Sequence, residues 1–326
     1  MTCSNTPLEP RCFRQSRVRF LRKAPGSPGG IRPAGFYKFK IGDWDAWSIS
    51  DGSLAFPSVQ PFFAKDSPKE QVDAVLRSEF LPTDHVDFQV NVLAVKTPQG
   101  VLLVDAGSGQ FGGPTSGFLQ MNLLAAGIKP ADVTAVILSH GHSDHLGGLI
   151  DAEGRLAFPN ATIYANKTEV DYWTTQNPDI SHMTITTSGQ KELVTTLTAI
   201  AHKVFAAIEK KIQKVAPGDK ILDSIELLAA PGHTPGHLNI LFKNGSEQLL
   251  HLVDTVHLPM QMAHPEWAMI FDYDVEIARQ TRKKAFARAA AERTRLFTYH
   301  VSYPGVGYIR PEGKGYEWIP ETWKWS

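Results

Sequence analysis

Three histidines and one aspartate lie within six residues in the segment VILSHGHSDHLGGL, residues 136–149. They are His140, His142, Asp144 and His145, and they follow an apolar run directly. Burying this many titratable side chains beside one another costs free energy unless something binds them together, and a divalent metal ion does that. The segment therefore predicts a metal site, with an internal hydrogen-bond network as the alternative interpretation.

The spacing of these four side chains favours two metal ions over one. His140 and His142 can point the same way from a turning backbone, while Asp144 and His145 leave it in other directions, so the four rarely converge on one tetrahedral ion. Two ions about 3.5 to 4 Å apart would need further ligands from elsewhere in the chain. The candidates stand at the ends of other apolar runs: His233 in AAPGHTPGH, Asp254 in LLHLVD and His300 in TYHVSYPG.

Further polar residues near these runs are expected to support the site. Asp105 ends the apolar run VLLVD, where it could hold a loop or orient a metal-binding histidine. His237 and His257 are expected either behind the ligands or in a substrate pocket.

Length and composition bound the kind of protein. The 326 residues are 42% hydrophobic and 20% charged, which suits a globular enzyme with a large core. Lys+Arg and Asp+Glu both total 33, so no net basic charge attracts nucleic acid or an anionic membrane. No apolar run reaches the roughly 18 residues of a membrane-spanning helix. We therefore expect a soluble protein that binds neither nucleic acid nor a membrane.

The first 34 residues differ in composition from the rest. They are rich in Arg, Pro, Ser and Gly, and they contain both cysteines, Cys3 and Cys12, so no thiolate site is expected in the body of the fold. We predict a flexible basic leader over 1–34, with a basic targeting peptide as the alternative, followed by one domain over 35–326. An apolar stretch typical of secretory signals is missing, which favours the cytoplasm and leaves the compartment open.

Strands and helices must carry the chemical residues to one place. Residues 36–52 predict a strand hairpin that turns at Gly42-Asp43, and Ser67 is expected to cap a helix whose first residue is Pro68. Two stretches, 90–107 and 238–255, each predict a strand, a turn and a second strand that ends in an aspartate. This echo indicates an internal duplication.

Three more elements complete the map. Apolar residues recur at helical spacing from Leu197 to Ile212, which predicts an amphipathic helix that packs on the core. Residues 275–296 predict a long helix with a basic outer face. The chain then reaches a short strand that carries His300.

The order of motifs HGHSDH, PGHTPGH, a strand-end aspartate and a late histidine resembles the metallo-β-lactamase superfamily. The resemblance extends from about Gly35 to Tyr308. It implies an α/β fold, an αββα sandwich of two similar halves, with the metal site at one edge between the sheets. It also implies two divalent ions, with zinc as the expected metal. One ion would be bound by His140, His142 and His233, the other by Asp144, His145 and His300, and Asp254 would bridge them.

Four segments are similar to the methyl parathion hydrolase group and its lactonase relatives: GFYKFKIGDWDAWSISDG, VDAGSGQFGGP, FDYD and YHVSYPGVGYIR. Relatives of this kind often pair, so a homodimer is an expected assembly. The aromatic residues near the site and the absence of an arginine-rich anion clamp favour a small, neutral, partly apolar substrate. The candidates for its pocket, which could equally be core residues, are Phe111, Trp173, His257 and Trp267.

The chemistry expected of two such ions is hydrolysis. A hydroxide held between two cations would attack a carbonyl carbon or a phosphorus, with Asp144 and Asp254 as the catalytic carboxylates. The predicted function is dinuclear metal-dependent cleavage of a lactone or ester, accompanied by phosphotriester cleavage. The alternatives are a phosphotriesterase as the main activity, a nuclease of the same fold, a redox di-iron protein and a metal-binding protein without catalysis.

Overall fold

Two seven-stranded sheets pack face to face in the computed structural model, which describes residues 34–183 and 187–324. In the first sheet the strands lie in chain order: β1 Phe36–Ile41, β2 Trp44–Phe56, β3 Val86–Thr97, β4 Gly100–Val104, β5 Val133–Leu138, β6 Thr162–Asn166 and β7 Ile212–Val215. The second sheet runs from β14 back to β8. Its strands are β8 Lys220–Ile221, β9 Ile225–Ala229, β10 Leu238–Asn244, β11 Glu247–His251, β12 Arg295–Phe297, β13 Val306–Glu312 and β14 Gly315–Pro320.

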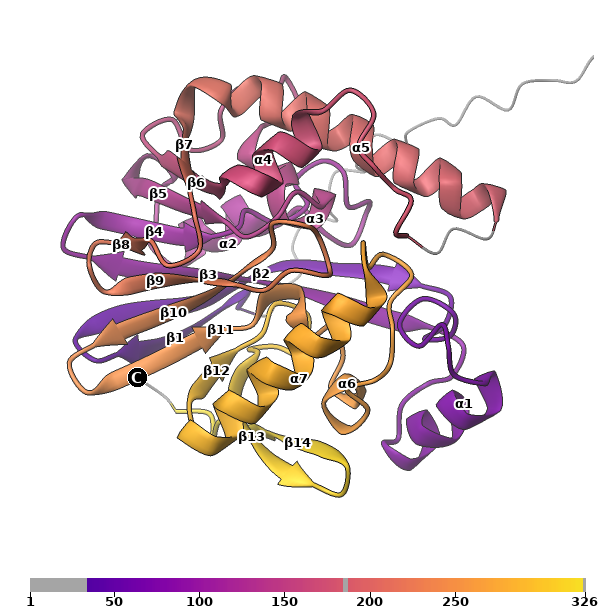
Figure 1. Ribbon diagram of the computed structural model, residues 1–326. Helices are drawn as coiled ribbons and strands as arrows, with labels where there is room; N and C mark the ends of the chain where they lie inside the picture. The colour runs from indigo at the N-terminus through magenta and orange to yellow at the C-terminus, as the bar shows by residue number, and fades with distance from the viewer. Residues whose placement is uncertain (1–33, 184–186, 325–326) are drawn as a thin grey trace, which may run out of the picture. The chain divides into compact units, whose positions relative to one another are not determined.

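Helices cover the outer faces of both sheets. Helices α2, α4 and α5 lie against the first sheet, and α7 lies against the second (Figure 1). The helices are α1 Lys69–Ser78, α2 Leu119–Ala125, α3 Ser143–Leu146, α4 Lys167–Thr174, α5 Ser188–Ile208, α6 Met260–Ala263 and α7 Val275–Glu292. This arrangement confirms the predicted α/β sandwich of two similar halves.

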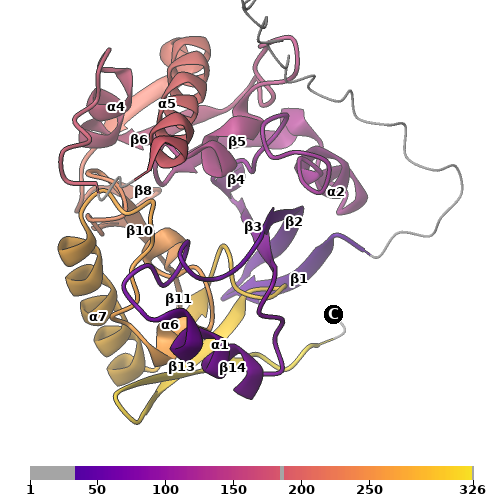
Figure 2. The same ribbon diagram turned by 90° about the vertical axis from the view of Figure 1, so that its right-hand side faces the viewer.

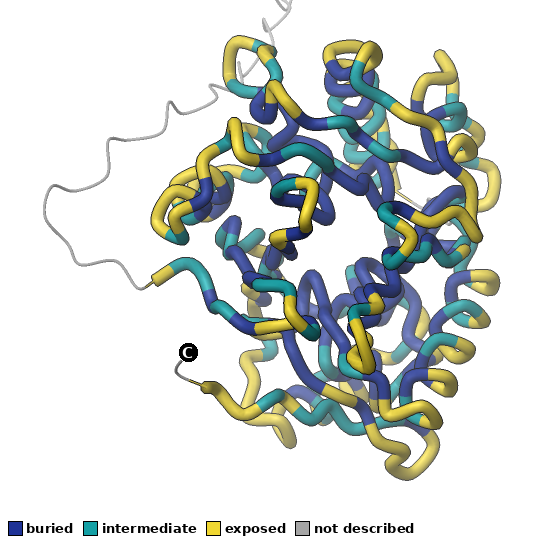
Figure 3. The backbone as a smooth tube through the Cα atoms, turned by 90° about the vertical axis from the view of Figure 1, so that its left-hand side faces the viewer, coloured by how far each residue is buried: buried dark blue, intermediate teal, exposed yellow. Residues whose placement is uncertain are grey.

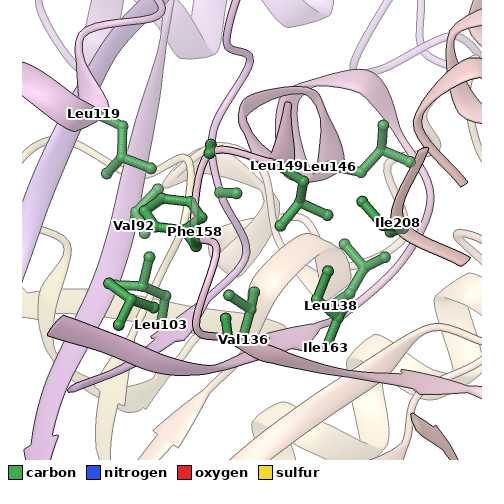
Figure 4. Packing of buried hydrophobic residues seen from close by; sticks show 14 of the residues in the cluster. Val92, Leu103, Leu119, Val136, Leu138, Leu146, Leu149, Phe158, Ile163 and Ile208 are labelled. Carbon is green, nitrogen blue, oxygen red and sulfur yellow. The ribbon is translucent and has the colours of Figure 1, made fainter. Parts of the chain in front are cut away.

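The central strands are buried on both faces because their side chains alternate between two apolar layers. In β4, Leu102 and Val104 pack between the two sheets, while Val101 and Leu103 pack under the helices. The layer under the helices is shown in Figure 4, where Leu103, Val136 and Leu119 come from two strands and a helix. Buried residues accordingly lie in the interior, and exposed residues lie in the outer helices and loops (Figure 3).

The predicted hairpins are confirmed. The long helix α7 is present, but it ends at Glu292 because Arg293 adopts a left-handed conformation, so Arg295 and Leu296 belong to β12 and not, as predicted, to the helix. Helix α1 begins one residue later than predicted. Pro68 has ψ 138°, outside the helical range, so Pro68 and not Ser67 occupies the cap position.

Helix α5 was placed too late in the chain. It begins at Ser188 because Thr187 and Gln190 form a reciprocal capping box, and it ends at Ile208, so Ile212 starts β7 instead of ending the helix.

Three strands end earlier than predicted. Strand β4 ends at Val104, one residue before Asp105. Strand β11 ends at His251, and Asp254 lies beyond it in a short 3₁₀ turn, Val253–Thr255. Strand β12 ends at Phe297, so His300 follows the strand instead of belonging to it.

Residues 1–33 of the predicted leader lie outside the described residues, so the leader and the domain boundary stay predictions. Across the described helices, none combines the length and the apolar character that crossing a membrane requires.

Candidate metal centre

Loops at one edge of the two sheets bring the seven predicted ligands together, and Figure 2 looks onto this edge. The loop after β5 carries His140 and His142, and helix α3 follows it with Asp144 and His145. The second sheet supplies the rest from three places: His233 between β9 and β10, Asp254 after β11, and His300 after β12. Residues more than 150 positions apart in the chain thus share one site.

The first group of facing atoms consists of His140 Nε2, His142 Nδ1, His233 Nε2 and Asp254 Oδ2. His142 Nδ1 lies 3.1 Å from His140 Nε2 and 2.9 Å from His233 Nε2. Asp254 Oδ2 lies 3.2 Å from His233 Nε2 and 3.7 Å from His140 Nε2. All four residues are buried, and their facing atoms lie within 4.8 Å of one another.

The second group consists of Asp144, His145 and His300. Asp144 Oδ2 lies 3.6 Å from His145 Nε2 and 3.5 Å from His300 Nε2. The other carboxylate oxygen of Asp254, Oδ1, lies 3.2 Å from each of these two imidazole nitrogens. Asp254 therefore faces the first group with one oxygen and the second group with the other.

The donor set fits divalent metal ions. Among the described residues, His145 Nε2, His300 Nε2 and Asp254 Oδ1 are buried side-chain atoms without a hydrogen-bond partner. Buried polar atoms of this kind are costly unless something satisfies them. All three face the second group, and one cation there would satisfy them, because neutral imidazole and carboxylate are its usual ligands. The first group offers the same kinds of ligand atom.

Burial and charge set the protonation of these groups. Burial lowers the pKa of His140 and of His142 well below the usual value, so both rings are neutral, the form that binds metal. Burial opposes ionisation of Asp254, but the surrounding histidines, His145 foremost, hold its pKa well below the usual range. Asp254 is therefore a carboxylate that carries a negative charge between the two groups.

Contacts with two carboxylates and one backbone carbonyl fix which nitrogen of three of the rings faces inward. The Nδ1 atom of His145 lies 2.8 Å from Asp105 Oδ2, and that of His233 lies 2.9 Å from Asp272 Oδ1. His300 donates from Nδ1 to the carbonyl oxygen of Gln89 at 2.6 Å. Each contact leaves Nε2 free to face the site. The structure thus places Asp105 in contact with His145, as its expected orienting role requires.

Two supporting residues were not singled out in the sequence. Asp272 belongs to the FDYD segment, which was noted only because it is similar to a segment of the methyl parathion hydrolase group. Tyr299 stacks on His145 with ring centroids 4.1 Å apart, and its hydroxyl donates to the Asp144 carbonyl at 2.9 Å. The only sequence feature that could have indicated a role for Tyr299 was its position next to the candidate ligand His300.

His237 and His257 both lie at the site. His237 Nε2 accepts the Asp254 backbone N–H at 3.2 Å, so it supports Asp254 from behind. His257 is fully buried, and its Nε2 lies 3.2 Å from Asp254 Oδ2. The structure thus places one of the two behind the ligand and the other against its carboxylate.

The aromatic pocket candidates lie in apolar layers. Trp173 is buried, with its ring 5.7 Å from that of His142, and Phe111 packs partly buried against the same layer. Trp267 is only 1% exposed and packs with Phe63 in a separate cluster. Contact of these residues with substrate stays a prediction.

Several known proteins are similar to this chain in sequence and fold. Residues 85–300 match the family model described as the metallo-beta-lactamase superfamily. The probable metallo-hydrolase YflN of Bacillus subtilis (strain 168) is 27% identical over 150 residues, 45% of this chain; the chain therefore spans about half, 53%, of that relative's length.

Two solved structures are similar over most of the chain. AidC, a dizinc quorum-quenching lactonase in complex with a product, is 31% identical with a TM-score of 0.84, covering 89% of this chain and 98% of its own. The hydrolase AbOPH, of the beta lactamase superfamily, is 27% identical with a TM-score of 0.82, covering 90% of this chain and 100% of its own.

Proposed function

This chain belongs to the metallo-β-lactamase superfamily and is a metal-dependent hydrolase, and from that premise we propose that it hydrolyses a lactone or ester with two divalent ions bound at the candidate metal centre. The observation that carries the proposal is the position of Asp254, whose two oxygens face two separate groups of buried histidines. A carboxylate so placed is suited to bridge two cations.

The proposed ligand sets are His140, His142 and His233 for the first ion, and Asp144, His145 and His300 for the second. Asp254 would contact both. We propose zinc as the metal, because histidine and carboxylate ligands suit it and because the similar lactonase AidC is a dizinc enzyme. When bound, the two ions would supply an activated water and a Lewis acid for the scissile carbonyl.

The residues of the chain have distinct parts in this chemistry. Asp105 and Asp272 contact Nδ1 of His145 and of His233, which directs Nε2 of each ring inward, toward the site of the proposed ion. Asp144 and Asp254 contribute the negative charge that would balance the two cations. The burial of the groups limits access of bulk water, which strengthens every electrostatic interaction within the site.

The proposed substrate is a small, neutral, partly apolar molecule. Equal numbers of acidic and basic residues give no general attraction for nucleic acid, and the similarity to AidC favours a lactone over other neutral substrates. Cleavage of phosphotriesters and assembly as a homodimer remain predictions from the sequence.

Hydrolysis assays separate the proposed substrates. We would measure kcat/KM of the full-length protein for an aryl lactone, an aryl ester and an aryl phosphotriester, each before and after treatment with a chelator. The proposal expects the lactone or ester to be cleaved best and the activity to return when zinc is added back. A protein that cleaves only the phosphotriester would reject the proposed substrate class, and chelator-resistant turnover would reject the proposed chemistry.

A further inference from the structure

Glu169 is a buried carboxylate near the metal centre that belongs to neither metal group. It lies in the first turn of α4 and is fully inaccessible to solvent. A charged side chain is rarely buried so completely unless its atoms are satisfied by specific partners. Its partners therefore indicate what the residue does.

Four donors surround the Glu169 carboxylate. Oε1 accepts the Gly141 backbone N–H at 2.9 Å and the Trp173 indole N–H at 2.5 Å. Oε2 accepts the Thr234 hydroxyl at 2.9 Å and the Gly236 backbone N–H at 2.8 Å. An ionised carboxylate accepts about four hydrogen bonds and donates none, so the four donors match the charged form. Burial raises the pKa of Glu169 above its usual value, and these same hydrogen bonds oppose that rise.

Three of the four donors belong to the loops that carry the first metal group. Gly141 stands between His140 and His142, in the loop after β5 of the first sheet. Thr234 follows His233 directly, and Gly236 lies in the same loop after β9 of the second sheet. One side chain thus connects the two segments that supply the three histidines of the first group.

The contact between these loops and α4 is close. A Cβ atom on Gly141 would lie 2.3 Å from Trp173 Cδ1, and one on Gly236 would lie 2.4 Å from the Glu169 backbone nitrogen. Asn166, which caps α4, donates from its side chain to the Gly236 carbonyl at 2.7 Å. The backbone of both loops is therefore held against the start of the helix with little freedom to shift.

We propose that Glu169 is a positioning residue for the first metal group. Its carboxylate fixes the His140–His142 segment relative to His233 and so sets the affinity of the site for its first ion. This inference rests on the proposed function, because it requires a metal ion in that group. The second group has different supports, since Asp105 holds His145 and the Gln89 carbonyl holds His300.

The test compares cobalt binding by three full-length proteins: the wild type, Glu169→Gln and Asp51→Asn. Gln keeps the size of Glu169, but its amide N–H group must face one pair of donors. Asp51 is a matched control, because it is equally buried and accepts three backbone N–H groups, from Ser108, Gly117 and Leu119, which do not adjoin a metal-group residue. Affinities would be measured by competition with a chromogenic chelator, and the visible spectrum of bound Co²⁺ would report on ligand geometry.

We expect Glu169→Gln to bind one of its two cobalt ions about 10- to 100-fold more weakly, the usual effect of losing a residue that orients metal ligands. The other ion should bind as in the wild type, and Asp51→Asn should bind both normally. Wild-type affinities and an unchanged spectrum in Glu169→Gln would overturn the proposal, as would equal weakening in Asp51→Asn.

A second variant covers the case in which Glu169→Gln does not fold. Thr234→Val removes one hydrogen bond to the carboxylate and preserves the shape of the side chain, so a several-fold weakening of the same ion is expected. No change in that variant would overturn the proposal. A wild-type protein that binds no metal would instead reject the proposed function itself. This result distinguishes failure of the proposed function from failure of the proposal for Glu169.

Discussion

Asp105 follows the β3–β4 hairpin of the first sheet, and Asp254 follows the β10–β11 hairpin of the second. In both halves the second hairpin strand then pairs in parallel with a further strand, β5 in one half and β12 in the other. A metal-group histidine comes after each of these strands: His140 after β5 and His300 after β12. The two halves thus repeat one arrangement of strands around two aspartates.

The surroundings of the two aspartates differ. Asp105 follows its strand directly, and its oxygens accept hydrogen bonds from the Ser139 N–H and hydroxyl and contact His145 Nδ1. Two residues separate Asp254 from its strand, and its Oδ1 faces imidazole Nε2 atoms with no hydrogen-bond partner in the described chain. Asp105 is therefore held by hydrogen bonds and supports His145. Asp254 instead faces imidazole nitrogens without other partners, which makes it the candidate metal ligand.

Among the substitutions that test this difference, Asp254→Asn is expected to have the largest effect on turnover. It removes the charge that faces both groups, so we expect turnover to fall by on the order of 10³-fold or more, because a bound ion contributes several kcal/mol of charge stabilisation. Steady-state rates and metal content would be measured together on a protein shown to be folded by circular dichroism. Near-normal turnover would reject the bridging role.

The substitution Asp105→Asn tests the supporting aspartate. Its amide would face His145 Nδ1 as a donor, which places the ring proton on Nε2, the atom that faces the second group. We expect a loss of about 10- to 100-fold in affinity for one ion. Chelator competition measures it, and a variant that loses both ions equally would contradict the separate role of Asp105.

Asp272→Asn should have a smaller effect on the other group. Asp272 contacts His233 Nδ1 with one oxygen and accepts the Met269 N–H at 3.1 Å with the other. This hydrogen bond is longer than the 2.8 Å bond from the Ser139 N–H to Asp105, so an amide orientation that keeps the histidine contact costs less at Asp272. We expect about a 10-fold weaker first ion, at the low end of the range for such supports. A larger loss than that of Asp105→Asn would reverse the predicted order.

The smallest effect is expected for Ser139→Ala. The Ser139 hydroxyl donates to Asp105 Oδ2 at 2.7 Å and lies 3.0 Å from His140 Nδ1, while the backbone N–H of the same residue still holds Asp105 Oδ1. We expect a loss of about 1 to 2 kcal/mol in the free energy of unfolding, because each of the two hydrogen bonds contributes about 1 kcal/mol. Urea denaturation of the metal-free protein would measure it, and metal stoichiometry should not change.

The sequence predicted the hairpins and the duplication, and it indicated seven ligand candidates because each lies at or shortly after the end of an apolar run. Apolar runs give strands, and strand ends gather at one edge of a sheet. Strand boundaries were predicted less well, since the 3₁₀ turn at Asp254 is decided by long-range packing rather than local pattern.

Asp105 was expected from the sequence to support a histidine, but two other residues that act through contacts distant in the chain were not found. Glu169 meets Gly236 across 67 positions, and Asp272 meets His233 across 39. A glutamate in a helical pattern is ordinarily a surface residue, so its sequence context gave no signal of burial. Only the folded arrangement shows that α4 contacts loops from both halves.

Metal analysis of the purified full-length protein tests the central claim most directly: that Asp254 joins two groups which each bind an ion. Elemental analysis would be combined with turnover measured before and after chelation. The account predicts about two equivalents of divalent metal per chain, lost together with activity and restored with it. A folded protein that contains no metal, or one whose turnover survives complete removal of metal, would contradict it.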